Sequence, residues 1–72
     1  MTGRAEVDGY ILYRDEDQRV WMLTPDNHNV ELLPGVTVTV LGDMFLFDEH
    51  GRVYFRKFGD EEAGWRGISF KN

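Results

Sequence analysis

The sequence predicts an all-β fold: a single small domain of five to six antiparallel strands, closed as a small barrel or a sandwich. Strand-type alternation runs through almost the whole chain. It is clearest in Val36-Thr37-Val38-Thr39-Val40, where valines fall on one face and threonines on the other. Clusters of Gly, Pro, Asp and Asn, which favour turns, separate the apolar stretches. The best helical candidate, residues 60–65, is only about one turn long.

Each predicted strand is an apolar or β-branched stretch that is bounded by turn residues. Residues 44–47 and 52–58 are joined by a short polar loop that ends in Gly51. Glycine suits the positive φ that such a hairpin loop usually requires. The predicted strands are residues 10–13, 19–24, 36–40, 44–47, 52–58 and 65–70, with a short extended piece at residues 30–33.

The two halves of the chain, residues 10–41 and 44–71, follow a similar plan. Each consists of a strand, an acidic loop, an Arg-Val-aromatic strand, a further loop and a Gly-led strand; the matching triplets are Arg19-Val20-Trp21 and Arg52-Val53-Tyr54. Two pseudo-repeated three-stranded units would produce this pattern, and so would any two hairpins. The length also fits an SH3-like barrel. We take residues 1–72 as one domain and leave open that residues 1–6 are disordered.

The composition is that of a small acidic soluble domain. Eight Lys and Arg residues against 13 Asp and Glu residues give a net charge of −5, and the chain has no cysteine. The lack of cysteine excludes disulfide scaffolds, cysteine nucleophiles and cysteine-based zinc sites. No apolar run approaches the roughly 18 residues of a membrane span, and the N-terminus lacks the apolar region of a signal peptide. We therefore expect a cytoplasmic protein that does not contact membranes.

The acidic excess lies in the first two-thirds of the chain. Residues 1–47 hold three basic and eight acidic residues, whereas residues 48–72 hold five of each. The negative electrostatic field of this acidic excess favours a partner with a basic surface and repels nucleic acid. A net charge of this size is also ordinary for the solubility of a small domain. The candidate acidic contacts are Asp8, Asp15, Glu16, Asp17, Asp26 and Glu31.

Large apolar residues occupy both faces of the predicted strands. In residues 19–24, for example, Val20 and Met22 oppose Trp21 and Leu23. One face must fill the interior, so the other lies against a partner or is covered within a closed sandwich. Trp and Tyr dominate the energetics of protein interfaces. The candidate anchors for a partner are Tyr13, Trp21, Tyr54 and Trp65.

Residues for catalysis are sparse. Ser69 is the only serine and lies in a predicted strand, while His28 and His50 lie on different loops. A serine nucleophile needs a base within about 3 Å, and nothing in this spacing indicates one. The triplets around the two histidines are explained by turns, and the glycines are too scattered for a phosphate-binding loop. We therefore expect no enzymatic activity, no metal and no cofactor.

The leading hypothesis is a non-enzymatic protein-binding module that uses an aromatic sheet face rimmed by carboxylates. Its sharper form is an inhibitor whose carboxylates stand in for phosphates on a basic, nucleic-acid-handling host protein. Small acidic proteins of this kind are typical of phage anti-defence or host-takeover factors, an association that rests on size and charge alone. Pairing of an exposed edge strand with its copy would instead give a homodimer.

The alternative hypothesis is single-stranded nucleic-acid binding through residues 52–58. This segment interleaves basic and aromatic residues, which contact phosphates and stack on bases. The net charge of −5 argues against it, because nucleic-acid-binding domains are normally basic. The residues concerned are Arg52, Tyr54, Arg56 and Phe58.

Overall fold

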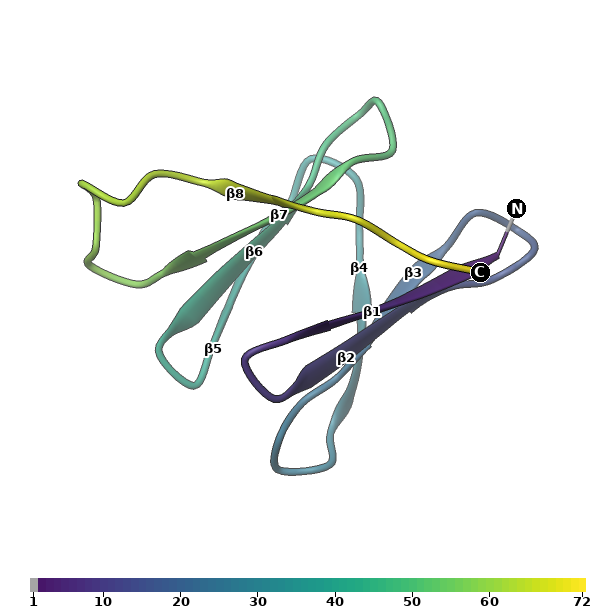
Figure 1. Ribbon diagram of the computed structural model, residues 1–72, viewed down its shortest axis with the longest axis horizontal. Coiled ribbons are helices and arrows are strands. Elements are labelled where there is room, and N and C mark those ends of the chain that lie inside the picture. Colours follow the sequence, from purple (N-terminus) through teal and green to yellow (C-terminus); the bar gives the residue numbers. More distant parts are fainter. Residues whose placement is uncertain (1) are drawn as a thin grey trace.

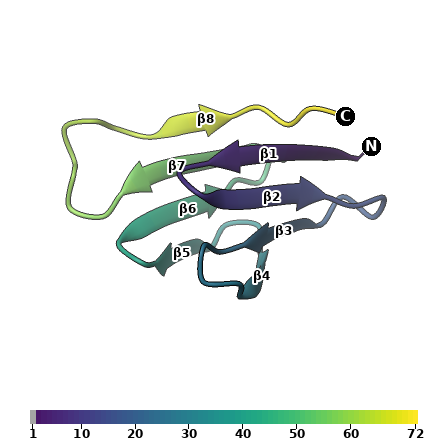
Figure 2. The same cartoon turned by 60° about the horizontal axis from the view of Figure 1, so that its bottom comes forward.

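The computed structural model describes residues 2–72, which form two four-stranded antiparallel sheets (Figure 1). The strand orders are β1-β2-β3-β4 and β5-β6-β7-β8, so sequential strands are neighbours within each sheet. Figure 2 shows the β1–β4 sheet in front of the β5–β8 sheet. The strands are β1 (Gly3–Val7), β2 (Tyr10–Arg14), β3 (Val20–Leu23), β4 (Asn29–Leu32), β5 (Thr37–Val40), β6 (Asp43–Phe47), β7 (Val53–Lys57) and β8 (Arg66–Ile68).

The all-β prediction is confirmed, but the strand count is wrong: residues 2–72 form eight strands rather than five to six. The sheets are not closed into a barrel, and each has four strands rather than three. The extended piece at residues 30–33 corresponds to β4. Residues 60–65, the one helical candidate, contain turns and no helix.

The strand that the sequence analysis missed is β1. It pairs with β2 through the two-residue turn Asp8-Gly9, whose φ angles are 44° and 87°. Positive φ at both positions is typical of a type I′ hairpin turn, for which Asp-Gly is a preferred pair. The Asp-Gly dipeptide between Val7 and Tyr10 is the feature of the sequence that indicates this hairpin. The residues left open for disorder thus include most of a strand, and Met1 lies outside the described residues.

The inner faces of the two sheets share one hydrophobic core. Phe45 of β6 is fully buried, and its ring centroid lies 4.8 Å from that of Tyr10 in the other sheet and 5.2 Å from that of Phe55. Tilted contacts of this kind suit the charge distribution of aromatic rings. The buried cluster is Tyr10, Leu12, Val20, Met22, Leu32, Phe45, Phe47, Val53 and Phe55.

Backbone contacts join the two sheets at two places. Near the link between β4 and β5, the amide of Gly35 donates to the carbonyl of Phe47 at 2.7 Å. At the other side, Arg4 of β1 and Lys71 of the C-terminal segment exchange two hydrogen bonds of 2.8 Å. Figures 1 and 2 both show this segment running from β8 back to β1.

Candidate functional site

The outer face of the β1–β4 sheet carries an apolar cluster, here called the aromatic patch: Ile11, Tyr13, Trp21 and Leu23. The antiparallel register places Tyr13 opposite Trp21 and Ile11 opposite Leu23. Side chains directly opposite each other on one sheet face are close enough to pack together. Tyr13 is 36% exposed, and the other three are partly buried. The patch is therefore a continuous, accessible surface of two neighbouring strands.

Polar and charged side chains flank the aromatic patch on the two outer strands. The register places Arg4 and Glu6 of β1 on one side of the patch and Asn29 and Glu31 of β4 on the other. Arg4 Nη2 lies 3.6 Å from Glu6 Oε1, and the Tyr13 hydroxyl lies 3.2 Å from Asn29 Oδ1. An apolar centre with a polar rim is the usual organisation of a protein interface.

Two carboxylates, those of Asp15 and Glu31, flank Trp21. Its indole Nε1 donates to Asp15 Oδ2 at 3.1 Å, and Glu31 lies opposite it on β4 and forms an ion pair with Arg19 at 3.9 Å. Desolvation alone raises the pKa of Asp15. The hydrogen bonds from Trp21 and from the amides of Arg19 and Asp17 outweigh this and hold the pKa below its usual range. The ionised carboxylate therefore orients the indole.

Three hairpin loops, residues 15–19, 24–28 and 48–52, share one local structure. In each loop the side-chain oxygen of the first residue accepts a hydrogen bond from the amide of the fifth, at 3.0, 2.9 and 2.8 Å respectively. The fourth residue has a positive φ, as short hairpin loops that end in a bulge require. These fourth residues are Gln18, Asn27 and Gly51, with φ angles of 66°, 66° and 84°.

Two more carboxylates stabilise these loops. Asp26 accepts a hydrogen bond from the Thr24 hydroxyl and lies 3.1 Å from His28 Nδ1; these two contacts lower the pKa of Asp26. Asp48 accepts from the amide of Arg52, which lowers the pKa of Asp48 against a smaller opposing effect of desolvation. Asp15, Asp26 and Asp48 thus have a structural role whether or not a partner contacts them.

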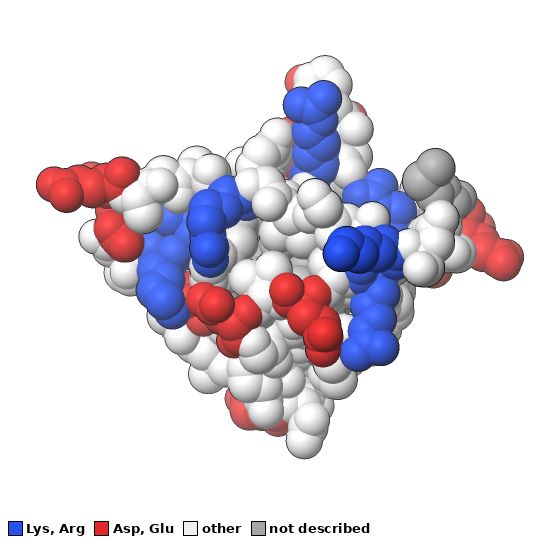
Figure 3. Space-filling view, in the orientation of Figure 1, with Lys and Arg blue, Asp and Glu red and all other residues white. Residues whose placement is uncertain are grey.

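The six acidic candidates do not form one surface. In an antiparallel meander, the β1–β2 and β3–β4 connections lie at one end and the β2–β3 connection at the other. Asp8 and Asp26 are therefore separated from Asp15, Glu16 and Asp17. Figure 3 likewise shows acidic side chains in several groups with basic side chains between them.

The four candidate anchors form two pairs on different sheets. Tyr54 lies on the outer face of β7, opposite Leu46, whereas the other two anchors belong to the aromatic patch. The Arg56 guanidinium carbon lies 5.0 Å from the centroid of the Trp65 ring, and Arg56 Nη2 lies 3.6 Å from Met44 Sδ. Tyr54 and Trp65 thus belong to a second outer face, on the β5–β8 sheet.

The basic-aromatic segment is only partly arranged as predicted. Tyr54 and Arg56 alternate on the outer face of β7, while Arg52 precedes the strand and Phe58 follows it. Phe58 is 66% exposed. Among the described residues, Nε of Arg56 is the one buried side-chain nitrogen or oxygen without a hydrogen-bond partner. Its guanidinium is instead held between Trp65 and a methionine.

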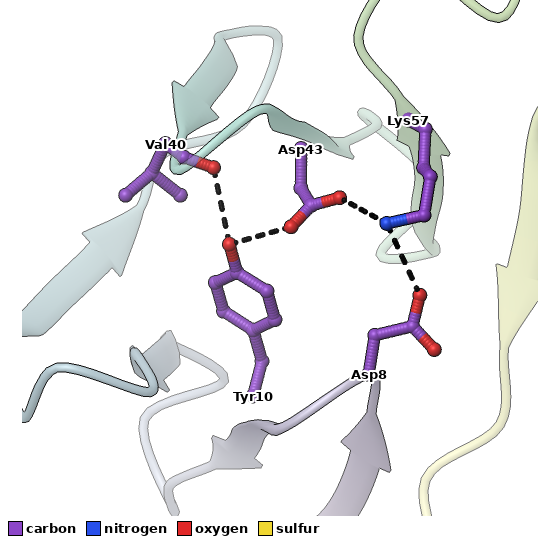
Figure 4. Close-up of polar contacts among 5 residues, drawn as sticks. All are labelled: Asp8, Tyr10, Val40, Asp43 and Lys57. Atoms are coloured by element: carbon purple, nitrogen blue, oxygen red, sulfur yellow. Dashed lines mark hydrogen bonds and ion pairs between the residues drawn. The ribbon is translucent and has the colours of Figure 1, made fainter.

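A polar cluster lies between the two sheets, and Figure 4 shows its geometry. The Tyr10 hydroxyl lies 2.7 Å from Asp43 Oδ2 and 3.0 Å from the carbonyl oxygen of Val40. Lys57 Nζ lies 3.2 Å from Asp43 Oδ1 and 3.8 Å from Asp8 Oδ2. Burial raises the pKa of the Tyr10 phenol, and Asp43 adds to this effect. The polar groups of the cluster provide one another's hydrogen-bond and ion-pair partners, so the cluster holds the two sheets together.

The residues considered for catalysis are not brought together. His28 lies in the β3–β4 loop and pairs with Asp26, while His50 lies in the β6–β7 loop, 3.9 Å from Glu49. Within residues 2–72, no group of three or more His, Cys, Asp or Glu side chains is arranged to hold a metal ion. The same residues include no helix long and apolar enough to span a membrane.

Comparisons with models of known protein families, with curated proteins and with solved structures find no match to this chain. The candidate site therefore rests on its own geometry. The aromatic patch is the strongest candidate, because it combines accessible aromatic side chains, a polar rim and nearby carboxylates.

Proposed function

We propose that this chain is a non-enzymatic protein-binding module and that its partner docks on the aromatic patch. The observation that carries the proposal is the block of Ile11, Tyr13, Trp21 and Leu23 on the outer face of β2 and β3. Burying these side chains against a partner would remove them from water, and Tyr and Trp are the residue types that contribute most to such contacts.

The patch alone is small for an interface. The whole outer face of the sheet, with four strands spaced about 4.8 Å apart and four to five residues each at a rise of about 3.4 Å, presents roughly 300 Å², and the patch occupies only part of it. Stable complexes bury about 800 Å² on each partner. We therefore expect the partner to extend beyond the patch onto a neighbouring loop, or to bind weakly and reversibly.

We favour an extension of the contact onto the β2–β3 loop, because the carboxylates of this loop indicate which charge the surface of the partner carries. Asp15, Glu16 and Asp17 lie there beside Trp21, with Glu31 nearby on β4 and Arg19 as the neighbouring cation. A partner with a basic surface complements this arrangement. A phosphate-mimicking inhibitor would use the same carboxylates. Asp8 and Asp26 lie at the opposite end of the sheet and are not included in the proposed contact.

The experiment is an affinity pull-down from a nuclease-treated lysate of the source organism, read by mass spectrometry, followed by titration with the retained protein. Tyr13→Ala and Trp21→Ala should each weaken binding by about tenfold or more, as hot-spot residues do. Tyr54→Ala and Trp65→Ala are the matched controls on the other sheet and should bind normally. Thermal melting of every variant checks that it is folded.

Salt dependence tests the charge of the partner. The apparent Kd should rise steeply between low and high salt, because exposed charges more than about 8–10 Å apart are screened at physiological ionic strength. Normal binding by both patch variants, with loss in both controls, would transfer the site to the β5–β8 sheet. A flat salt response would remove the basic partner from the proposal.

A second candidate function is single-stranded nucleic-acid binding on the outer face of the β5–β8 sheet. The observation that favours it is the row formed by Tyr54 and Arg56, with the Trp65 ring stacked on the guanidinium. Such an arrangement offers stacking surfaces beside a cation. Fluorescence titration with labelled single-stranded oligonucleotides at low salt tests it: binding that Arg56→Gln reduces supports it, and no binding by the wild-type chain excludes it.

A further inference from the structure

The two sheets meet at a seam that is paired at one point only. Arg4 of β1 and Lys71 form an antiparallel backbone pair. Continued in the same register, the next pair would be Glu6 with Ser69. Among the described residues, no backbone hydrogen bond beyond that of Arg4 and Lys71 crosses this seam. The two edges therefore part after one pair instead of closing the sheets into a barrel.

Unpaired backbone groups on β1 face this seam. In an antiparallel ladder, alternate residues direct their N–H and C=O groups to opposite sides. Arg4 directs both groups toward Lys71 and thus away from β2. Glu6, two residues further along β1, directs its own groups the same way. It lies where the edges have separated, so its amide and carbonyl have no strand partner on that side.

The C-terminal segment, on the opposite side of the seam, also has backbone groups that point into the seam. Lys71 points its backbone groups toward β1, and by the same alternation Ser69 and Gly67 do so as well. The other side of β8 is already occupied, because β8 pairs with β7 through Arg66 and Ile68, which flank Gly67. The seam is thus bordered on both sides by strand edges whose backbone groups point into it.

A groove of about 780 Å³ lies between the edges and is lined by residues of β1 and of the C-terminal segment. Val7 and Ile68, one from each wall, are packed against the core and give the groove an apolar floor. The charged residues of its lining are Arg4, Glu6 and Lys71, and Arg4 Nη2 lies 3.6 Å from Glu6 Oε1. Figure 3 shows, on this side of the molecule, uncharged surface bordered by acidic and basic side chains.

We propose that an extended strand of a partner protein, with apolar residues at alternate positions, inserts into this groove. An unpaired strand edge is a template for another strand, and here two edges face one space. Alternate side chains of the inserted strand would contact Val7 and Ile68, while the intervening ones would point to the outer surface. A second copy of this chain would present an edge to only one of the two walls, whereas an inserted strand bonds to both. This site borders the aromatic patch at Glu6, but it uses backbone groups and inward-facing side chains rather than the four residues of the patch.

The test uses the full chain and a labelled peptide, acetyl-Val-Lys-Val-Lys-Val-amide, followed by fluorescence polarisation and by NMR amide exchange. Binding should slow exchange at the amides of Glu6, Gly67 and Ser69. It should leave Ala5 and Ile68 unchanged, because these already bond to β2 and β7 respectively. A peptide with Pro in place of the central Val should bind at least tenfold more weakly, whereas Glu in place of Lys should change binding far less.

Two variants remove one groove-facing amide each. Glu6→Pro should weaken peptide binding at least tenfold, whereas Glu6→Thr, which keeps the amide, should weaken it far less. Proline is tolerated on an edge strand where the lost N–H faces outward. Ser69→Pro removes a groove-facing amide from the other wall and should also weaken peptide binding. This variant provides the test if Glu6→Pro fails to fold.

Three results would overturn the proposal. The first is no binding of the peptide at millimolar concentration, and the second is binding by both proline variants that is as tight as that of the wild-type chain. The third is protection of the same amides without peptide, through concentration-dependent dimerisation. The last would assign the seam to a second copy of the chain. Failure here is distinguishable from failure of the proposed function, because Tyr13→Ala and Trp21→Ala should leave peptide binding unchanged.

Discussion

The Tyr10 hydroxyl lies 2.7 Å from Asp43 Oδ2, and this contact joins β2 of one sheet to β6 of the other. Asp43 is only 6% exposed, so its carboxylate depends on protein groups for hydrogen bonds. Lys57 supplies a second contact at 3.2 Å. The pair therefore fixes the separation of the two sheets at the end of the molecule that holds the β1–β2 turn.

We expect Tyr10→Phe to lower the free energy of unfolding by about 1–2 kcal/mol, because a buried carboxylate loses a donor. Tyr13→Phe is the matched control. It removes the same hydroxyl from an exposed position beside Asn29 and should cost less than about 0.5 kcal/mol. Urea unfolding followed by circular dichroism measures both. Equal losses would show that the inter-sheet contact adds nothing to stability.

Acid should destabilise the fold through its loops. Hydrogen bonds hold the pKa values of Asp15, Asp26 and Asp48 below the ordinary aspartate range. A carboxyl whose pKa is lower in the folded state stabilises the fold fully above its unfolded pKa of about 4, and this contribution is lost as pH falls through the folded pKa.

We therefore expect the urea midpoint to fall steeply below about pH 4 and Asp48→Asn to flatten that fall. Glu49→Gln makes the same charge change one residue away, without the hydrogen bonds to the amides of His50 and Arg52. It should leave the acid limb of the profile steeper than Asp48→Asn does. Identical profiles for the two variants would assign the acid sensitivity to overall charge.

Leu41 is a residue whose replacement should stabilise the fold. It lies in the two-residue turn between β5 and β6 with a φ of 50°, and its side chain is 57% exposed. A leucine at positive φ is sterically strained, whereas Asn-Gly is favoured in such turns. Leu41→Asn should raise the free energy of unfolding by about 0.5–1 kcal/mol and raise Tm by several degrees.

Gly42 provides the control for this turn. It has a φ of 76°, so Gly42→Ala places a Cβ in the same strained region and should lower Tm. Differential scanning calorimetry measures both variants. A lower Tm for Leu41→Asn would mean that the exposed leucine makes a contact worth more than the strain.

Gly3 allows the C-terminal segment to approach β1. A Cβ at this position would lie 3.0 Å from Cβ of Phe70, too close without movement of the backbone. Gly3→Ala should therefore separate the Arg4 and Lys71 pair, speed exchange of both amides, and destabilise the fold by about 1 kcal/mol. At Gly67 an added Cβ meets only Cε2 of Tyr54 at 3.9 Å, so Gly67→Ala should leave the two amides protected.

Local pattern was sufficient for most of the strands and for the alternation within them, although β1 was missed. Val20 and Met22 are buried together, and Trp21 lies on the opposite face, as their period-two spacing predicts. The loops at residues 15–19, 24–28 and 48–52 were recognised from their Asp, Asn, Pro and Gly residues, whereas the Asp8-Gly9 turn was missed. The shared hydrogen bonding within the three loops was not recognised, because a side-chain oxygen that accepts from an amide four residues away cannot be told from a solvated carboxylate in sequence.

Tyr13 and Trp21 of the aromatic patch were candidate anchors from the sequence, whereas Ile11 and Leu23 were not, and the sequence could not place the four together. Tyr13 and Trp21 become neighbours only through the register of β2 with β3. Tyr54 and Trp65 fall on the other sheet because a break between β4 and β5 divides the chain into two meanders. Nothing local marks that break as different from a hairpin connection.

The sequence by itself determined the all-β class, most of the strands and which residues of each strand share a face. Only the tertiary structure decided which face is buried, because both faces are apolar and burial of either would satisfy the local pattern. Phe45 and Phe47 are buried, while Met44 and Leu46 lie on the outer face, because the first pair meets Tyr10 and the inward residues of the opposite sheet. The open seam has the same origin: whether Glu6 pairs with Ser69 depends on the angle between two packed sheets, which no segment of the chain specifies alone.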